Sequence, residues 1–356
     1  MSVLSKPLDD GRGAAARADA ARRRGVARLA ATIDDLFLAD DARLDDRTRA
    51  TLIRVVGTIV GGIEADVRRR AAAILTGWAE DAAAATLLAA RDTALALLAN
   101  AGVLREAALM DEIIGCVRQD LLAEVLPLLA AKEDRPDLLV RLTDVADDAV
   151  AAAARGLLAA LARRRDGVGA HGWLSADNHH RLLWWTAAAI RDGLARDPLI
   201  DRAIEAAALQ SLAAHDEGDR VEALATRLAI AIDARPGELP ALLLDSLGDG
   251  ALALFIAVLA RAAALDYDQA RAIVLDHEAD PLWLVVRAIG LDRATIARIG
   301  LSLADADPRR DVEAFADALD TIAAVDPDDA RIALSPFSTH ADLRRAIDDL
   351  ARGRAA

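Results

Sequence analysis

Apolar positions along much of the chain follow the spacing of an α-helix. In the segment 64–79, Val67, Ala71 and Leu75 recur every four residues, which places them on one face of a helix. A half-buried strand would show alternation with a period of two instead, and no stretch of the sequence shows it clearly. The pattern therefore predicts an all-α fold.

The same apolar face recurs at intervals of 41 to 42 residues. Residues 64–79 align with 147–162 at an offset of 83 residues, and the midpoint falls on the segment that begins at Glu106. A unit of about 40 residues accommodates two helices and their turns, which is the period of HEAT-like helical hairpins. An acidic residue ahead of a valine, as at Glu64, also suits the N-terminus of the second helix of such a hairpin. We therefore expect helical repeats in the first half of the chain.

Glycines and prolines change the pattern after residue 165. Three glycines interrupt the segment 163–173, and the 41-residue register fades beyond it. Seven prolines then separate stretches of helical length, several as Asp-Pro, which suits an N-cap followed by the first helical position. The sequence thus predicts a flexible N-terminus at 1–14, a HEAT-like helical-repeat solenoid over 15–165, and a less regular all-helical domain over 171–352.

Composition and charge narrow the classes of partner. The net charge of −14 opposes binding to a phosphate backbone, so we expect no nucleic-acid partner and at most nonspecific affinity for duplex DNA. No uninterrupted apolar run reaches the roughly 18 residues of a membrane span, so no membrane association is expected. The single cysteine, Cys116, excludes an internal disulfide, and its apolar helical position predicts a buried structural thiol.

The segment 176–191, ADNHHRLLWWTAAAIR, holds two of the six histidines and two of the five tryptophans. Consecutive helical positions are about 100° apart, so only one of the two adjacent histidines can lie on the apolar stripe. His179 shares that stripe with Leu183 and Ile190. The phase predicts that His179 is buried and that His180 is more accessible.

The flanks of this helix carry the candidate binding residues. Phase groups His180, Trp184 and Arg191 on one flank and places Trp185 on the other, so the two tryptophans are expected to point apart and not to line one narrow pocket together. Two interpretations stay open: the aromatic side chains fill gaps between alanine-rich helices, or one flank forms a surface for a partner.

Recognised catalytic and cofactor-binding motifs are missing from the sequence. It contains no phosphate-binding glycine loop, no dinucleotide fingerprint and no nucleophile elbow. The segment 288–304 has the outline of a helix-turn-helix, but its acidic surroundings favour a plain helical hairpin. The adjacent histidines diverge and are poorly spaced for a metal ion. We therefore expect no catalytic residue, no cofactor and no metal ligand.

Two stretches resemble a known family. NHHRLLWWTAAAIR at 178–191 and ARAIVLDHEADPLWLVVRAIGLDRATIARI at 270–299 are similar to an alphaproteobacterial family of helical proteins of unknown function, in which HEAT-like repeats often come first. The resemblance spans roughly 90–335 and is most specific from His179 to Arg191. It implies a bacterial cytoplasmic protein, and it assigns no reaction and no catalytic residues.

These observations favour a non-enzymatic interaction or scaffold protein, because helical arrays expose long surfaces. A regulatory role is compatible with this prediction. The expected partner is another protein or a second copy of this chain. The alternative is a small-ligand sensor or an enzyme with a pocket between the two helical halves, using His180, Trp184 and Arg191. A concave pocket holding these side chains would favour the alternative, and a continuous apolar patch would favour the interaction protein.

Overall fold

The computed structural model describes residues 43–90, 93–129, 136–166 and 172–334, and the single positions 343, 346, 347 and 350. Contacts divide the chain into two compact units, Met1–Arg49 and Ala50–Ala356, and the packing described below lies within the second. The predicted flexible segment 1–14 and residues 167–171 at the predicted domain boundary lie outside the described residues. The three-part division of the chain therefore stays a prediction.

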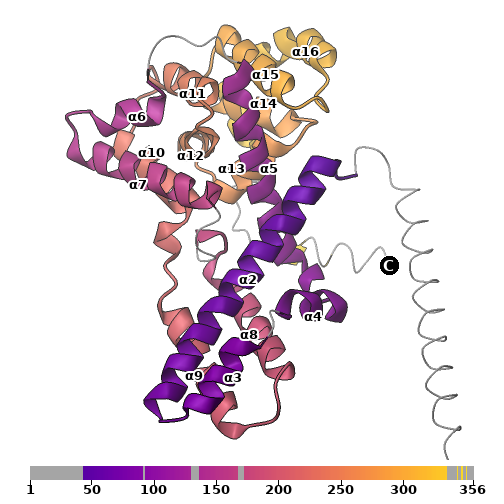
Figure 1. Ribbon diagram of the computed structural model, residues 1–356. Coiled ribbons are helices and arrows are strands. Elements are labelled where there is room, and N and C mark those ends of the chain that lie inside the picture. Colours follow the sequence, from indigo (N-terminus) through magenta and orange to yellow (C-terminus); the bar gives the residue numbers. More distant parts are fainter. Residues whose placement is uncertain are drawn as a thin grey trace, which may run out of the picture. The chain divides into compact units, whose positions relative to one another are not determined.

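Helices make up 80 % of the described residues, and no strand occurs among them, which confirms the all-α prediction. The helices are α2 (Asp46–Gly77), α3 (Asp81–Ala89), α4 (Ala94–Ala101), α5 (Ala107–Leu129), α6 (Leu138–Thr143), α7 (Asp148–Arg165), α8 (Ala176–Asp192), α9 (Pro198–Ala213), α10 (Val221–Ile232), α11 (Leu239–Gly248), α12 (Leu252–Ala263), α13 (Tyr267–Leu275), α14 (Asp280–Ala288), α15 (Arg293–Ala306), α16 (Val312–Ala324) and α17 (Pro327–Leu334), with 3-10 turns η2 (Val103–Arg105) and η4 (Glu217–Asp219) (Figure 1).

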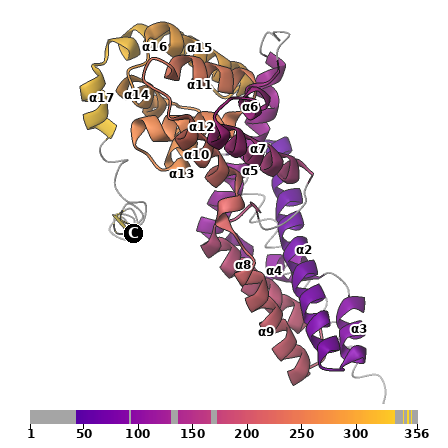
Figure 2. The same ribbon diagram turned by 90° about the vertical axis from the view of Figure 1, so that its left-hand side faces the viewer.

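Helix α12 forms the centre of the largest hydrophobic core. Every residue from Leu252 to Ala260 is buried, which is typical of a helix that is apolar on all sides. The reason is its surroundings: α5, α10, α11, α13 and α14 all contact it, and both views show it inside this group (Figures 1 and 2). Arg261 ends the apolar run, is exposed, and pairs with Asp233.

The positions that repeat in the sequence are core positions. Val67 and Leu75 on α2 are fully buried, and Val150 on α7 is buried as well, as predicted. Leu158, which aligns with Leu75 at the offset of 83 residues and should therefore be buried, is only partly covered. The apolar face is therefore confirmed at most of these positions.

The helix start predicted at Glu64 is wrong. Helix α2 runs unbroken from Asp46 to Gly77, so Glu64 lies in its middle. This carboxylate is buried, pairs with Arg68 at 2.7 Å and accepts a hydrogen bond from the backbone N–H of Ala94, the first residue of α4. Glu64 does stabilise the start of a helix, but of a neighbouring one, and the hairpin pattern does not extend to this segment.

The Asp-Pro pairs begin helices at Pro198 and Pro327, but the prediction is wrong at Asp280, because α14 begins at Asp280 itself and its capping position is Ala279. Helices α9 and α17 begin at Pro198 and Pro327, each after an aspartate that accepts a backbone N–H. The prediction is also wrong at Asp307, because α16 begins only at Val312, after the capping residue Asp311. Asp307 pairs with a nearby arginine instead.

No single helix in the described part is long and apolar enough to cross a membrane. The bent pair α3 and α4, whose axes differ by 65°, reaches the necessary length and composition only when both helices are counted together.

Candidate functional site: a hollow on helix α8

Helix α8 buries the stripe that the sequence predicts. His179 and Leu183 have no exposed surface and Ile190 is 1 % exposed, whereas His180 is exposed. Helices α4 and α9 contact α8. The different environments of the two adjacent histidines are therefore confirmed.

His179 contributes to packing. Its imidazole stacks on that of His215, with 4.1 Å between the ring centroids and 6° between the ring planes. His215 follows the end of α9 and is half-buried. The pair joins α8 to the chain beyond α9, so His179 serves the interior of the protein and not its surface.

The other side of α8 carries an open hollow with a volume of about 440 Å³. It is lined by Asp177, His180, Arg181, Trp184 and Trp185. Both tryptophans are half-buried, and His180 meets the edge of Trp184 with 6.3 Å between ring centroids and 66° between ring planes. Both tryptophans line this hollow, which is open and wide, whereas the sequence prediction excluded only one narrow pocket lined by both. An open hollow spans a wide arc of the helix surface, so two positions about 100° apart can both line it.

Arg191 is separate from the hollow. Its guanidinium pairs with Asp201 of α9, with 3.1 Å between Nε and Oδ1. The structure thus brings together three of the four predicted binding residues, His180, Trp184 and Trp185, and assigns Arg191 to the contact between α8 and α9.

Two lining residues, Asp177 and Arg181, were missed in the sequence. They lie four residues apart, and Arg181 lies three and four residues before the tryptophans, so helical spacing alone could have grouped them. Arg181 pairs with Glu106, with 2.7 Å between Nη1 and Oε1. Among the described residues, Asp177 forms no ion pair.

The N-terminal end of α8 has an acidic border. The backbone N–H of Ala176 donates to the carboxylate of Glu217 in η4. Asp216 and Asp219, on either side of Glu217, are exposed. Glu217 thus lies at the start of α8, beside Ala176, the residue before Asp177.

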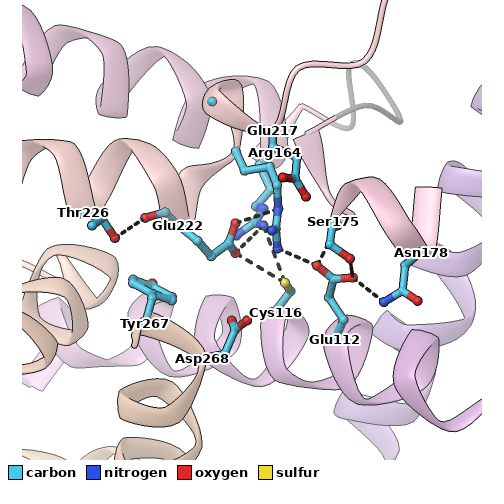
Figure 3. A network of polar contacts seen from close by, with 12 residues as sticks. Glu112, Cys116, Arg164, Ser175, Asn178, Glu217, Glu222, Thr226, Tyr267 and Asp268 are labelled. Atoms are coloured by element: carbon cyan, nitrogen blue, oxygen red, sulfur yellow. Dashed lines mark hydrogen bonds and ion pairs between the residues drawn. The ribbon is translucent and has the colours of Figure 1, made fainter. Parts of the chain in front are cut away.

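Glu112 of α5 anchors the first turn of α8 (Figure 3). Its carboxylate accepts hydrogen bonds from the backbone N–H of Ser175 at 2.8 Å, from the Ser175 hydroxyl at 2.9 Å and from the Asn178 amide at 2.6 Å. Arg220 forms an ion pair with the same carboxylate. Ser175 is the residue directly before α8, but its hydroxyl donates to Glu112 and makes no capping bond. Glu112 therefore fixes where α8 begins.

A second carboxylate, Glu222 of α10, lies at the centre of the buried charges. Its carboxylate oxygens lie 2.8 Å from Arg164, 3.6 Å from Arg220 and 3.7 Å from Arg271. Burial alone would raise the pKa of Glu222, but the three positive charges outweigh burial and lower the pKa to about 2. The carboxylate is therefore ionised throughout the neutral range.

Cys116 lies within the same network. Its Sγ is 3.4 Å from Glu222 and 3.6 Å from Arg164. Burial, followed by the charge of Glu222, raises the pKa of the thiol to about 12. The prediction of a buried structural thiol is confirmed, because a neutral and inaccessible sulfur is a poor nucleophile.

The pKa values of Asp120 and Tyr267, two further groups of the network, are shifted as well. Burial raises the pKa of Asp120 to about 6, although Arg164 lies 3.5 Å away, and it raises the pKa of Tyr267 well above its usual range. In the part of the chain that the structure describes, no group of three or more His, Cys, Asp or Glu side chains is arranged to hold a metal ion. The chemistry of the network is thus mainly that of stable internal pairing.

Comparison with known proteins identifies a family. Neither a curated protein nor a solved structure matches this chain. The family described as "Uncharacterised protein conserved in bacteria (DUF2336)" matches residues 118–335, which is more than half of the chain. The match contains the whole of α8 as well as Glu222, and it agrees with the predicted resemblance to a family of unknown function. The chain belongs to this bacterial family, DUF2336.

Proposed function

We propose that this protein is a non-enzymatic protein-interaction protein of the bacterial cytoplasm, and that the hollow on α8 is part of its partner surface. The hollow itself carries the proposal, because it exposes two tryptophans, a histidine and an arginine on one helix. These residue types combine a large apolar area with polar edges, and tryptophan and arginine are enriched where interfaces gain most of their affinity.

The way α8 is held supports a binding role. Glu112 and Glu217 fix its first turn, and α4 and α9 contact it. A rigid helix loses little conformational freedom when a partner binds, so more of the contact energy remains as affinity.

The enzyme or ligand-sensor alternative has weaker support. The hollow lies on one helix and not between two halves of the chain. General acid–base catalysis works best with a pKa near the working pH, but the pKa values of Glu222 and Cys116 are about 2 and about 12. Asp120 has a suitable pKa of about 6, yet it is paired with Arg164 and does not line the hollow.

A repeat relation remains part of the proposal for two segments only. Residues 106–117 and 147–162 each begin at or just before a helix start, those of α5 and α7, and each buries its apolar face. Stacked helical units expose extended surfaces to partners, so such a relation would suit an interaction protein.

Replacing Trp184 by alanine tests the proposal. As part of a partner surface, Trp184→Ala should weaken association by about 2 kcal/mol or more and leave the melting temperature nearly unchanged. If Trp184 mainly packs against the fold, the same change should instead destabilise the protein by about 3 to 5 kcal/mol. Trp78→Ala is the matched control, because Trp78 is 46 % exposed and lies outside the hollow.

Photo-cross-linking in the host cell locates the surface directly. A benzophenone amino acid at the exposed position Ala188 on α8 should form one dominant adduct, and the adduct should be lost when Trp184→Ala is added. The same group in place of Trp78 should give no such adduct. A partner that is captured equally by wild type and by a folded Trp184→Ala variant contradicts the proposal.

A further inference from the structure

We infer that the hollow on α8 receives a positively charged side chain, arginine or lysine, projecting from the partner protein. This inference rests on the proposed function and adds the chemistry of the partner. It follows from three features of the described residues: the two tryptophans, the carboxylates at one end of the hollow, and the ion pair that offsets the charge of its arginine.

The tryptophans provide the apolar part of the recognition. Trp184 and Trp185 are both half-buried, so each ring rests on the fold and still presents surface to the hollow. The face of an indole ring attracts a cation more strongly than any other aromatic side chain does. Arginine and lysine also have long apolar stems, which can lie along the rings while the charged group reaches further.

The carboxylates lie where the charged group would arrive. Asp177 lines the hollow one helical turn before Arg181, is exposed, and forms no ion pair among the described residues. Glu217 reaches the backbone N–H of Ala176, directly before Asp177, and two further exposed aspartates belong to the same acidic turn. A guanidinium or ammonium group can pair with these oxygens at close range.

An unpaired Arg181 would repel a cation, but the charge of Arg181 is paired. Its guanidinium lies 2.7 Å from the carboxylate of Glu106, and this surface ion pair offsets its charge. The whole chain carries a net charge of −14, which favours the approach of a basic partner and disfavours an acidic one. An acidic side chain in the hollow would face Asp177 with the same sign of charge.

Selection from a peptide library tests the inference. A library of random peptides, about twelve residues long, is selected on the full-length protein and depleted against the Trp184→Ala variant, whose folding is first checked by its melting curve. The recovered peptides should be enriched in arginine or lysine relative to the library. The dissociation constant of one recovered peptide is then compared with that of the same peptide carrying citrulline, which keeps the shape of arginine without its charge. Citrulline should weaken binding about tenfold, the order of a cation–π contact with a partly desolvated tryptophan.

Two aspartate variants test whether the effect of the peptide's charge depends on Asp177 in the hollow. Asp177→Asn should weaken binding of the arginine peptide several-fold and leave the citrulline peptide unaffected. Asp192→Asn is the matched control, because Asp192 is exposed at the other end of the same helix and does not line the hollow. Its affinity for both peptides should equal that of the wild type.

The possible outcomes distinguish failure of this inference from failure of the proposed function. Peptides that distinguish wild type from Trp184→Ala but are apolar or acidic, or that bind equally well with citrulline, overturn the inference and leave the proposed function standing. If no peptide distinguishes the wild type from the Trp184→Ala variant, both the proposed function and the inference are overturned. An effect of Asp192→Asn as large as that of Asp177→Asn also overturns the inference, since general charge and not the hollow would then explain it.

Discussion

Replacing Glu222 by glutamine removes the central negative charge of the buried network. Glutamine keeps the shape of the side chain, so the change leaves Arg164, Arg220 and Arg271 close together without the carboxylate that all three approach. The side chains of Arg164 and Arg271 are only 4 % and 7 % exposed, so water cannot easily replace the lost partner. The variant should therefore be clearly less stable than the wild type.

The shifted pKa of Glu222 gives the size and the pH dependence of this effect. The ordinary pKa of 4.5 falls to about 2 in the folded protein, so the folded state binds the proton less tightly than the unfolded state. At about 1.4 kcal/mol per pKa unit, the difference corresponds to about 3 kcal/mol of stability. This agrees with the roughly 3 to 5 kcal/mol by which breaking a buried ion pair usually destabilises a protein. The contribution is complete above pH 4.5 and is lost as the pH falls toward 2.

Urea unfolding of wild type and Glu222→Gln at several pH values measures this contribution. The difference in the free energy of unfolding should be about 3 kcal/mol at pH 7 and less than about half of that at pH 3. Asp120 acts in the opposite direction, because its raised pKa of about 6 makes the protein lose stability as the pH rises from about 4 to about 6. The charge of Glu222 contributes to raising that pKa, so the variant should show less of this loss than the wild type.

Glu205→Gln is the control for this experiment. Glu205 is exposed on α9, so its replacement should change stability by less than about 0.5 kcal/mol at any of these pH values. A difference for Glu222→Gln that stays the same from pH 7 to pH 3 would refute the reasoning, since the cost would then come from packing and not from the charge.

Two further changes test the packing of the fold. Gly300→Ala should destabilise the protein by about 1 to 3 kcal/mol, because the new Cβ would lie 2.1 Å from the ring of Phe315. Gly61→Ala, in open space on α2, should instead stabilise it by about 0.5 to 1 kcal/mol. Thermal unfolding measures both changes, and equal effects would contradict the contact with Phe315. Cys116, the only cysteine, should react with iodoacetamide at pH 8 far more slowly in the native protein than in guanidinium chloride, because burial raises its thiol pKa to about 12. Mass spectrometry measures the extent of labelling, and fast labelling of the native protein would disprove the burial of the thiol.

Local periodicity explains which parts of the fold the sequence predicts. Burial at Val67, Val150 and His179 follows from helical phase, because each depends on residues within two turns of the same helix. The role of Glu64 could not be predicted this way. Its partner Ala94 lies 30 residues further along the chain, and α2 continues through the position where a hairpin was expected.

The same distinction applies to the candidate site. His180, Trp184 and Trp185 were found because they are unusual residues close together on one helix. Arg191 was misplaced because its partner Asp201 belongs to another helix. The buried network gave no local signal at all: its members come from α5, α7, α10 and α13, and Cys116 and Glu222 are 106 residues apart. Only the folded chain brings such residues together, so single-sequence periodicity cannot indicate them.

Glu112 connects the buried network to the hollow, and its replacement separates support from contact. It binds Ser175 and Asn178 at the start of α8 and pairs with Arg220, which also approaches Glu222. Glu112→Gln turns one acceptor into an amide that faces these donors, at a cost of about 1 to 3 kcal/mol.

This loss should act mainly on the first turn of α8, where Asp177 enters the hollow. Hydrogen exchange of the first-turn amides should therefore accelerate more in Glu112→Gln than in Glu222→Gln, even if both variants lose similar global stability. Affinity for a peptide selected on the hollow should fall in the same order, because a loosened turn must be ordered again on binding. If exchange accelerates while affinity stays at the wild-type value, the anchoring of α8 by Glu112 is irrelevant to recognition, and a binding surface preorganised by the buried network is ruled out.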